Sequence, residues 1–304
     1  MSDRKQTIAV VGASGQQGQG VVEALKADGA FRVRALTRNP ERYRGPADEA
    51  IYADLDRPES LNEAFRDAYG VFAMTNAWQP GTDEIAQGRA MVAAAKAQNA
   101  EHFVWSTLPD VEKLSGGRFD VPHFTNKARV NEYVATAGFR YYSYVMPAFY
   151  YQNFAQNLAV RPQPDGSLGW SLPIGPDVAI DMADIGELGK LVAAVFRHPQ
   201  ETGQGLYLPH VGSQISFNDI IGGFERQGIE LTFSQVPAEP FAKAVPGGHE
   251  LAQMFAWFEA YGYFGGDFTQ ERQLATRLVG QAPTGFFEWA KNSLRLERES
   301  DEES

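Results

Sequence analysis

The stretch that decides the fold is Thr7-Ile8-Ala9-Val10-Val11-Gly12-Ala13-Ser14-Gly15-Gln16-Gln17-Gly18. Its apolar start is typical of a buried parallel strand, and the glycines follow as G-x-x-G-x-x-G. In a strand-to-helix turn, the first glycine permits the sharp reversal, the second admits a diphosphate, and the third allows close helix packing. The free amides and the helix dipole then face the anion. A plain tight turn would need the same glycines, but the position favours a diphosphate held by Gly12, Ser14, Gly15, Gln16, Gln17 and Gly18.

Strand and helix patterns alternate from this loop to about residue 145. Strands are predicted at 7–11, 31–36, 50–53, 71–74, 103–105 and 141–145, with helices between them. This alternation predicts an α/β protein with a Rossmann-type, doubly wound parallel sheet. After Pro147 the pattern becomes irregular. We therefore expect a nucleotide-binding domain over 1–150, a smaller α+β C-terminal substrate- or partner-side domain over 151–296, partly interleaved with the first, and an acidic tail over 297–304.

Composition narrows the function classes. The chain has no cysteine, so disulfides, thiolate catalysis and cysteine-ligated metals are excluded. Its formal charge of −11 argues against direct nucleic-acid binding. The five histidines have no metal-ligand spacing. The first residues lack an apolar signal segment and no run reaches membrane-spanning length, so a cytoplasmic protein is expected.

The end of the second strand reads Leu36-Thr37-Arg38-Asn39-Pro40, about 20 residues beyond the glycines. NAD sites usually place a carboxylate here, on the ribose 2′-hydroxyl, whereas Arg38 suits a 2′-phosphate. A solvated arginine is the plainer alternative. Thr37 and Arg38 thus predict NADPH or NADP+ in preference to NADH. Asp54 and Leu55, after the third strand, are placed to border the adenine, although Asp54 could instead cap a helix.

Proton-handling groups follow the fifth strand. Short-chain reductases on such a sheet use a Tyr as general acid, a Lys four residues later, and a Ser or Thr that polarises the carbonyl. Ser106 and Thr107 stand at the right strand end, and Lys127 stands on the expected helix. None of the 12 tyrosines has a lysine four residues on; His123 takes that place. His123 could be the general acid or a packing residue, and Ser106 and Thr107 could orient a substrate or satisfy backbone groups.

These features resemble the NmrA-like branch of the atypical short-chain dehydrogenase/reductase superfamily. The resemblance rests on residues 12–18, 37–38, 123–127, 147–153 and 183–186. It implies that Lys127 contacts the nicotinamide ribose and that Tyr150 and Asn153 close the pocket at the nicotinamide end. We expect further cofactor contacts from Thr75, Asn76 and Pro147.

Two functions remain open, because some such families turn over substrate without the tyrosine and some members sense NADP(H) without turnover. One is an NADPH-dependent oxidoreductase acting on a small apolar carbonyl, imine or conjugated substrate, with Lys127, His123, Ser106 and Thr107 as catalytic candidates. The other is a redox sensor that regulates a protein partner. A scaffold that binds no nucleotide is a third reading, and a homodimer is compatible with each.

Overall fold

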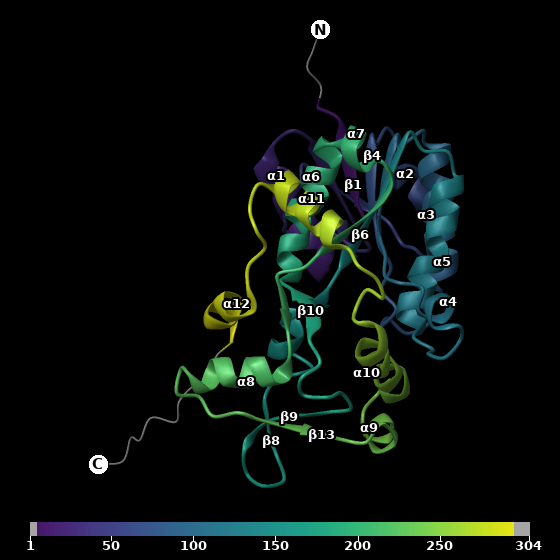
Figure 1. Ribbon diagram of the computed structural model, residues 1–304. Coiled ribbons are helices and arrows are strands. Elements are labelled where there is room, and N and C mark those ends of the chain that lie inside the picture. The colour runs from purple at the N-terminus through teal and green to yellow at the C-terminus, as the bar shows by residue number, and fades with distance from the viewer. Residues whose placement is uncertain (1–4, 295–304) are drawn as a thin grey trace.

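A computed structural model describes residues 5–294 of the 304-residue chain (Figure 1). Its centre is a seven-stranded sheet with the order β11-β6-β5-β4-β1-β2-β3, in which every neighbouring pair is parallel. The strands are β1 (Thr7–Val10), β2 (Arg32–Thr37), β3 (Glu49–Tyr52), β4 (Gly70–Ala73), β5 (His102–Ser106), β6 (Tyr141–Pro147) and β11 (Gln204–His210). The order of the first six strands reverses between β1 and β4, as in a Rossmann fold. The predicted fold class is confirmed.

Helices cover both faces of this sheet (Figure 1). Successive strand residues point to opposite faces, so Ile8 and Val10 pack toward α1 and α6, whereas Ala9 and Val11 belong to the core beneath α2, α3 and α5. The helices of the five crossovers that join the first six strands are α1 (Gln16–Asp28), η1 (Pro40–Arg42), α2 (Glu59–Ala64), α3 (Glu84–Ala97), α4 (Val111–Ser115) and α5 (Pro122–Thr136). Both sheet faces are therefore buried, as near-continuous apolar strands require.

Part of the chain beyond residue 150 returns to the sheet. After η3 (Ile185–Glu187), α6 (Leu188–Arg197) packs on α1, α7 (Pro199–Thr202) follows, and β11 pairs with β6. Later, α11 (Thr269–Val279) packs on α6 and β11. At the α1–α6 crossing a Cβ on Gly189 would lie 2.0 Å from the Gly20 carbonyl oxygen, so the two backbones touch directly. The domain division at residue 150 stays a prediction; residues 185–210 and 269–279 lie with the sheet.

The remaining elements form a second body below the carboxyl ends of the strands (Figure 1). It holds two three-stranded sheets, β12-β10-β7 and β13-β9-β8, around an aromatic core. Its elements are β7 (Phe149–Tyr150), η2 (Tyr151–Ala155), β8 (Arg161–Pro162), β9 (Leu168–Leu172), β10 (Ile180–Ala183), β12 (Ser213–Ile215), α8 (Phe217–Glu225), β13 (Thr232–Gln235), α9 (Ala238–Ala244), α10 (Gly248–Tyr261) and α12 (Phe286–Ser293). This body closes one side of the space beside the nucleotide loop.

Across residues 5–294, no helix combines the length and the apolar character needed to cross a lipid bilayer. The predicted acidic tail, 297–304, lies outside the described residues.

Candidate functional site

The glycine loop joins β1 to α1 as the sequence predicts. Gly12 has φ of +67°, a left-handed conformation that favours glycine. Gly15 is the N-cap of α1, no side chain caps this helix end, and its first turn carries no acidic residue. A Cβ on Gly18 would lie 2.2 Å from the Gly12 carbonyl oxygen, so Gly18 allows the helix to approach the loop. The amides of the first turn are thus left for an anion.

A cleft of about 1430 Å³ opens from this loop along the carboxyl ends of the strands. One part is lined by the expected nucleotide contacts: Gly12, Ser14, Gly15, Gln16, Gln17, Thr37, Arg38, Asp54, Leu55, Thr75, Asn76, Lys127, Pro147, Tyr150 and Asn153. Gly18 does not line the cleft; its place is the helix contact described above. The rest of the cleft is mostly apolar, with Phe241, Leu251, Met254 and Phe255 from α9 and α10. The cleft therefore lies between the large sheet and the second body.

The adenosine side of the predicted site lies around the end of β2. Arg38 is exposed and lines the cleft, and no ion pair engages it within residues 5–294. The Thr37 hydroxyl accepts a hydrogen bond from the Asn39 amide (3.3 Å). Asp54 accepts from the Asp56 amide (3.1 Å), an Asx-type turn in the loop before α2. The guanidinium is thus free to meet an anionic group.

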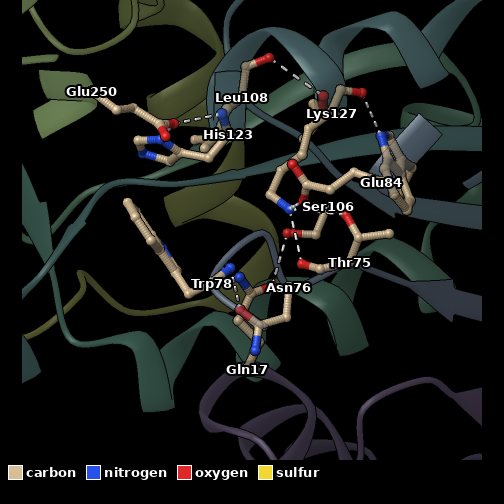
Figure 2. A network of polar contacts seen from close by, with 12 residues as sticks. Gln17, Thr75, Asn76, Trp78, Glu84, Ser106, Leu108, His123, Lys127 and Glu250 are labelled. Carbon is tan, nitrogen blue, oxygen red and sulfur yellow. Dashed lines mark hydrogen bonds and ion pairs between the residues drawn. The ribbon is translucent and has the colours of Figure 1, made fainter. Parts of the chain in front are cut away.

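Lys127 is buried at the centre of the site, on α5, and its ammonium has three acceptors (Figure 2). It donates to the Thr75 carbonyl oxygen (2.8 Å), to the Thr75 hydroxyl oxygen (2.9 Å) and to Glu84 Oε1. The Thr75 hydroxyl in turn donates to Glu84 Oε1 (2.7 Å). Burial lowers the pKa of Lys127, and the Glu84 carboxylate acts in the opposite direction. The two charges compensate each other inside the protein.

Ser106 and Thr107 do not line the cleft, contrary to their expected role with substrate. Both side chains are buried. Ser106 donates to Gln17 Oε1 (2.8 Å), and Thr107 donates to Asn131 Oδ1 (2.8 Å). Because these hydroxyls serve other protein groups, we do not retain them as substrate contacts. The sequence placed them at the correct strand end but could not show which way they point.

His123 lines the cleft from the first turn of α5 and is held by Glu250 of α10. Glu250 Oε1 accepts from the His123 backbone amide (2.9 Å) and lies 2.5 Å from His123 Nδ1 (Figure 2). Partial burial would raise the pKa of Glu250, but the bonds from His123 bring it below its usual value. A carboxylate can only accept, so Nδ1 carries the proton and Nε2 is left for a ligand. The Trp78 ring packs 4.9 Å from the imidazole.

Tyr150 and Asn153 reach the cleft from β7 and η2, as the resemblance implies. Gln17 Nε2 donates to the Tyr150 hydroxyl oxygen (2.6 Å). Burial raises the pKa of Tyr150 to about 12, although the bond from Gln17 acts to lower it. Tyr150 is therefore a neutral hydroxyl at neutral pH.

Sequence reasoning missed two carboxylates, Glu84 and Glu250. They lie 43 and 127 residues from their partners, and neither spacing carries a local signal. Trp78 was also missed: its side chain is 57% exposed, and it lines the cleft beside His123. Within the described part of the chain no group of three or more histidine or acidic side chains could hold a metal.

Known proteins are similar to this chain in sequence. An NmrA-like family domain-containing protein of Dictyostelium discoideum is 28% identical over 281 residues, covering 86% of this chain and 90% of that protein. The NmrA-like family domain-containing oxidoreductase FrzB of Cladobotryum sp is 28% identical over 72% of each chain.

Among solved structures, NmrA, named as a negative transcriptional regulator, superposes with a TM-score of 0.80 in its complex with NAD. Its complex with NADP gives 0.77; both are 24% identical over 95% of each chain. At 24% identity, the similarity to NmrA supports a shared fold and nothing further. The sequence pattern of the NmrA-like family, however, matches residues 4–291, nearly the whole chain. The chain therefore belongs to the NmrA-like family.

Proposed function

We propose that this protein binds NADP(H) in the cleft and prefers it to NADH. The uncapped start of α1 offers amides to the diphosphate, and Arg38 offers a guanidinium to the 2′-phosphate. The related fold of NmrA accepts both NAD and NADP, so the preference rests on Arg38. The residues present fit such a dinucleotide: its anionic groups would meet donors, and no acidic side chain stands in the first turn of α1.

We further propose that the protein is an NADPH-dependent oxidoreductase for a small apolar carbonyl, imine or conjugated substrate. The bound nucleotide would supply a hydride. Lys127 would face the nicotinamide ribose, and His123, when both of its ring nitrogens carry a proton, would offer the proton at Nε2 to the acceptor. Phe241, Met254 and Phe255 would exclude water from the acceptor. FrzB, a relative, is named an oxidoreductase.

The observation that carries this proposal is the size and character of the cleft. Single small-molecule sites usually occupy about 300–1000 Å³, and this cleft measures about 1430 Å³. The additional space lies against apolar side chains that a charged dinucleotide does not need. It therefore suits a second, apolar ligand beside the nucleotide.

The test is NADPH consumption, followed by its absorbance, with a panel of quinones, aldehydes and imines. At least one acceptor class should be reduced, and Lys127→Met should abolish this turnover. Lys113→Met, which removes an exposed lysine on α4, is the matched control and should retain it. Tight nucleotide binding with no acceptor consumed would refute the oxidoreductase.

A specific observation favours a second candidate, the NADP(H) sensor that regulates a partner protein. All three donors of Lys127 are engaged within the protein, and the hydroxyls of Ser106 and Thr107 donate to protein side chains. A site with few free proton donors suits binding better than turnover. NmrA, a structural neighbour, is named a negative transcriptional regulator.

Calorimetric titration with NADP+ and NADPH distinguishes the sensor. A sensor should bind the two forms with different affinity and consume neither, because only differential affinity can shift a conformational equilibrium. Equal affinities would refute it. The small-molecule substrate, the regulatory protein partner, the homodimer and the cytoplasmic location stay predictions.

A further inference from the structure

Glu84 is a buried carboxylate that the proposed chemistry does not use. Its side chain is 2% exposed, it begins α3, and Oε1 accepts from both Lys127 and Thr75. Within residues 5–294 its second oxygen, Oε2, is buried and has no hydrogen-bond partner. Burying a carboxylate with an unsatisfied oxygen costs free energy, so its charge needs an explanation.

Hydrogen bonding alone does not explain this carboxylate. A glutamine could accept the same bonds from Lys127 and Thr75 through its amide oxygen, without burying a negative charge. What a glutamine would lack is the charge that balances the ammonium. The start of a helix also favours an anion, and Glu84 is the first residue of α3.

The charge balance between Glu84 and Lys127 matters because only the lysine lines the cleft, whereas Glu84 is buried and does not line it. The nicotinamide ring carries a positive charge in NADP+ and none in NADPH. An unbalanced ammonium beside the ring would weaken binding of the oxidised form, and low-dielectric surroundings would strengthen this effect. A lysine whose charge is balanced by Glu84 can lie beside the nicotinamide ribose without that penalty.

We propose that Glu84 is a positioning residue that sets the redox-state selectivity of the bound nucleotide by neutralising Lys127. Glu84 does not line the cleft, so it acts through the lysine. The inference rests on the proposed binding of NADP(H) in this cleft.

The test compares the dissociation constants for NADP+ and NADPH in the wild type, Glu84→Gln and Asp83→Asn. The ratio of the NADP+ constant to the NADPH constant should rise about fivefold or more in Glu84→Gln. A tenfold rise corresponds to about 30 mV in the midpoint potential of the bound two-electron couple. Asp83→Asn removes the same charge one residue earlier, at an exposed N-cap that asparagine also serves, and should leave the ratio within twofold.

A merely structural role would weaken both forms together and leave the ratio unchanged, so an unchanged ratio in Glu84→Gln overturns the proposal. If Glu84→Gln does not fold, Lys127→Gln and the double variant decide. Lys127→Gln leaves the carboxylate unbalanced and should lower the ratio, and Glu84→Gln/Lys127→Gln should restore it; no change in Lys127→Gln overturns the proposal. A wild type that binds neither form refutes the proposed function itself, which is a distinct result.

Discussion

Replacing Arg38 with alanine tests the coenzyme preference directly. The side chain lines the cleft and is exposed, with no ion pair to break among residues 5–294. The change should therefore remove a ligand contact and little else. Measured stability should stay within about 0.5 kcal/mol, as for other surface substitutions.

The magnitude follows from the kind of contact. Hydrogen bonds to charged groups contribute about 1.5–3 kcal/mol, and exposure places Arg38 at the lower end. Because about 1.4 kcal/mol is a factor of ten, the NADPH dissociation constant should rise about tenfold. NADH lacks the 2′-phosphate, so its constant should change less than about twofold.

Isothermal titration with both coenzymes at fixed ionic strength is the assay. Added salt should narrow the wild-type preference, because an exposed charge pair is screened. Arg42→Ala removes an equal, exposed charge in η1, outside the cleft lining, and controls for general attraction of anions. If Arg38→Ala keeps the NADPH preference of the wild type, the assignment of Arg38 to the 2′-phosphate is wrong.

Two further predictions concern the loop and the link between the two bodies. Gly18→Ala places a methyl group 2.2 Å from the Gly12 carbonyl oxygen, so it should lower the free energy of unfolding by about 1–3 kcal/mol and abolish NADPH binding. Thermal melting and titration with NADPH check these two effects. In the control Gly222→Ala the nearest atom to the new methyl group is 3.5 Å away, so stability and NADPH binding should both be retained. Glu250→Gln should cost about 1 kcal/mol at neutral pH, because the partly buried hydrogen bonds from His123 then go to a neutral amide oxygen in place of a carboxylate. Since the folded-state pKa of Glu250 lies below its ordinary 4.5, the wild type holds this stabilisation above that pH and loses it as the pH falls through the folded-state value. The free energies of unfolding of the wild type and Glu250→Gln should therefore converge as the pH falls. A difference between them that grows on acidification would contradict the pairing of Glu250 with His123.

The strands of the sheet that carry a local sequence signal could be predicted. Apolar runs and glycine punctuation located β1 to β6, and the alternation with helices implied their parallel pairing. The seventh strand was not foreseen. Residues 204–210 are half-exposed over much of their length, and they pair with β6 across more than 50 residues of intervening chain. Pairing over such a separation leaves no periodicity in the sequence.

The site divides in the same way. Residues placed by a strand end or by a predicted helix, such as Arg38 and Lys127, line the cleft as expected. The direction of a side chain at a strand end is a tertiary property, so the sequence left open whether Ser106 and Thr107 orient a substrate, and the structure shows their hydroxyls bonded to Gln17 and Asn131. The partners of buried charges could not be foreseen either, because only the fold brings Glu84 to Lys127.

The return of α6 and β11 to the sheet limits how the protein can be divided. A fragment ending at residue 150 would leave the hydrogen-bonding edge of β6 bare and uncover the apolar stripe on α1 that α6 now hides. Open strand edges and uncovered apolar helices promote aggregation. A shortened version meant for expression should therefore extend through Val279, the last residue of α11, since the sheet reaches its full width and cover only there.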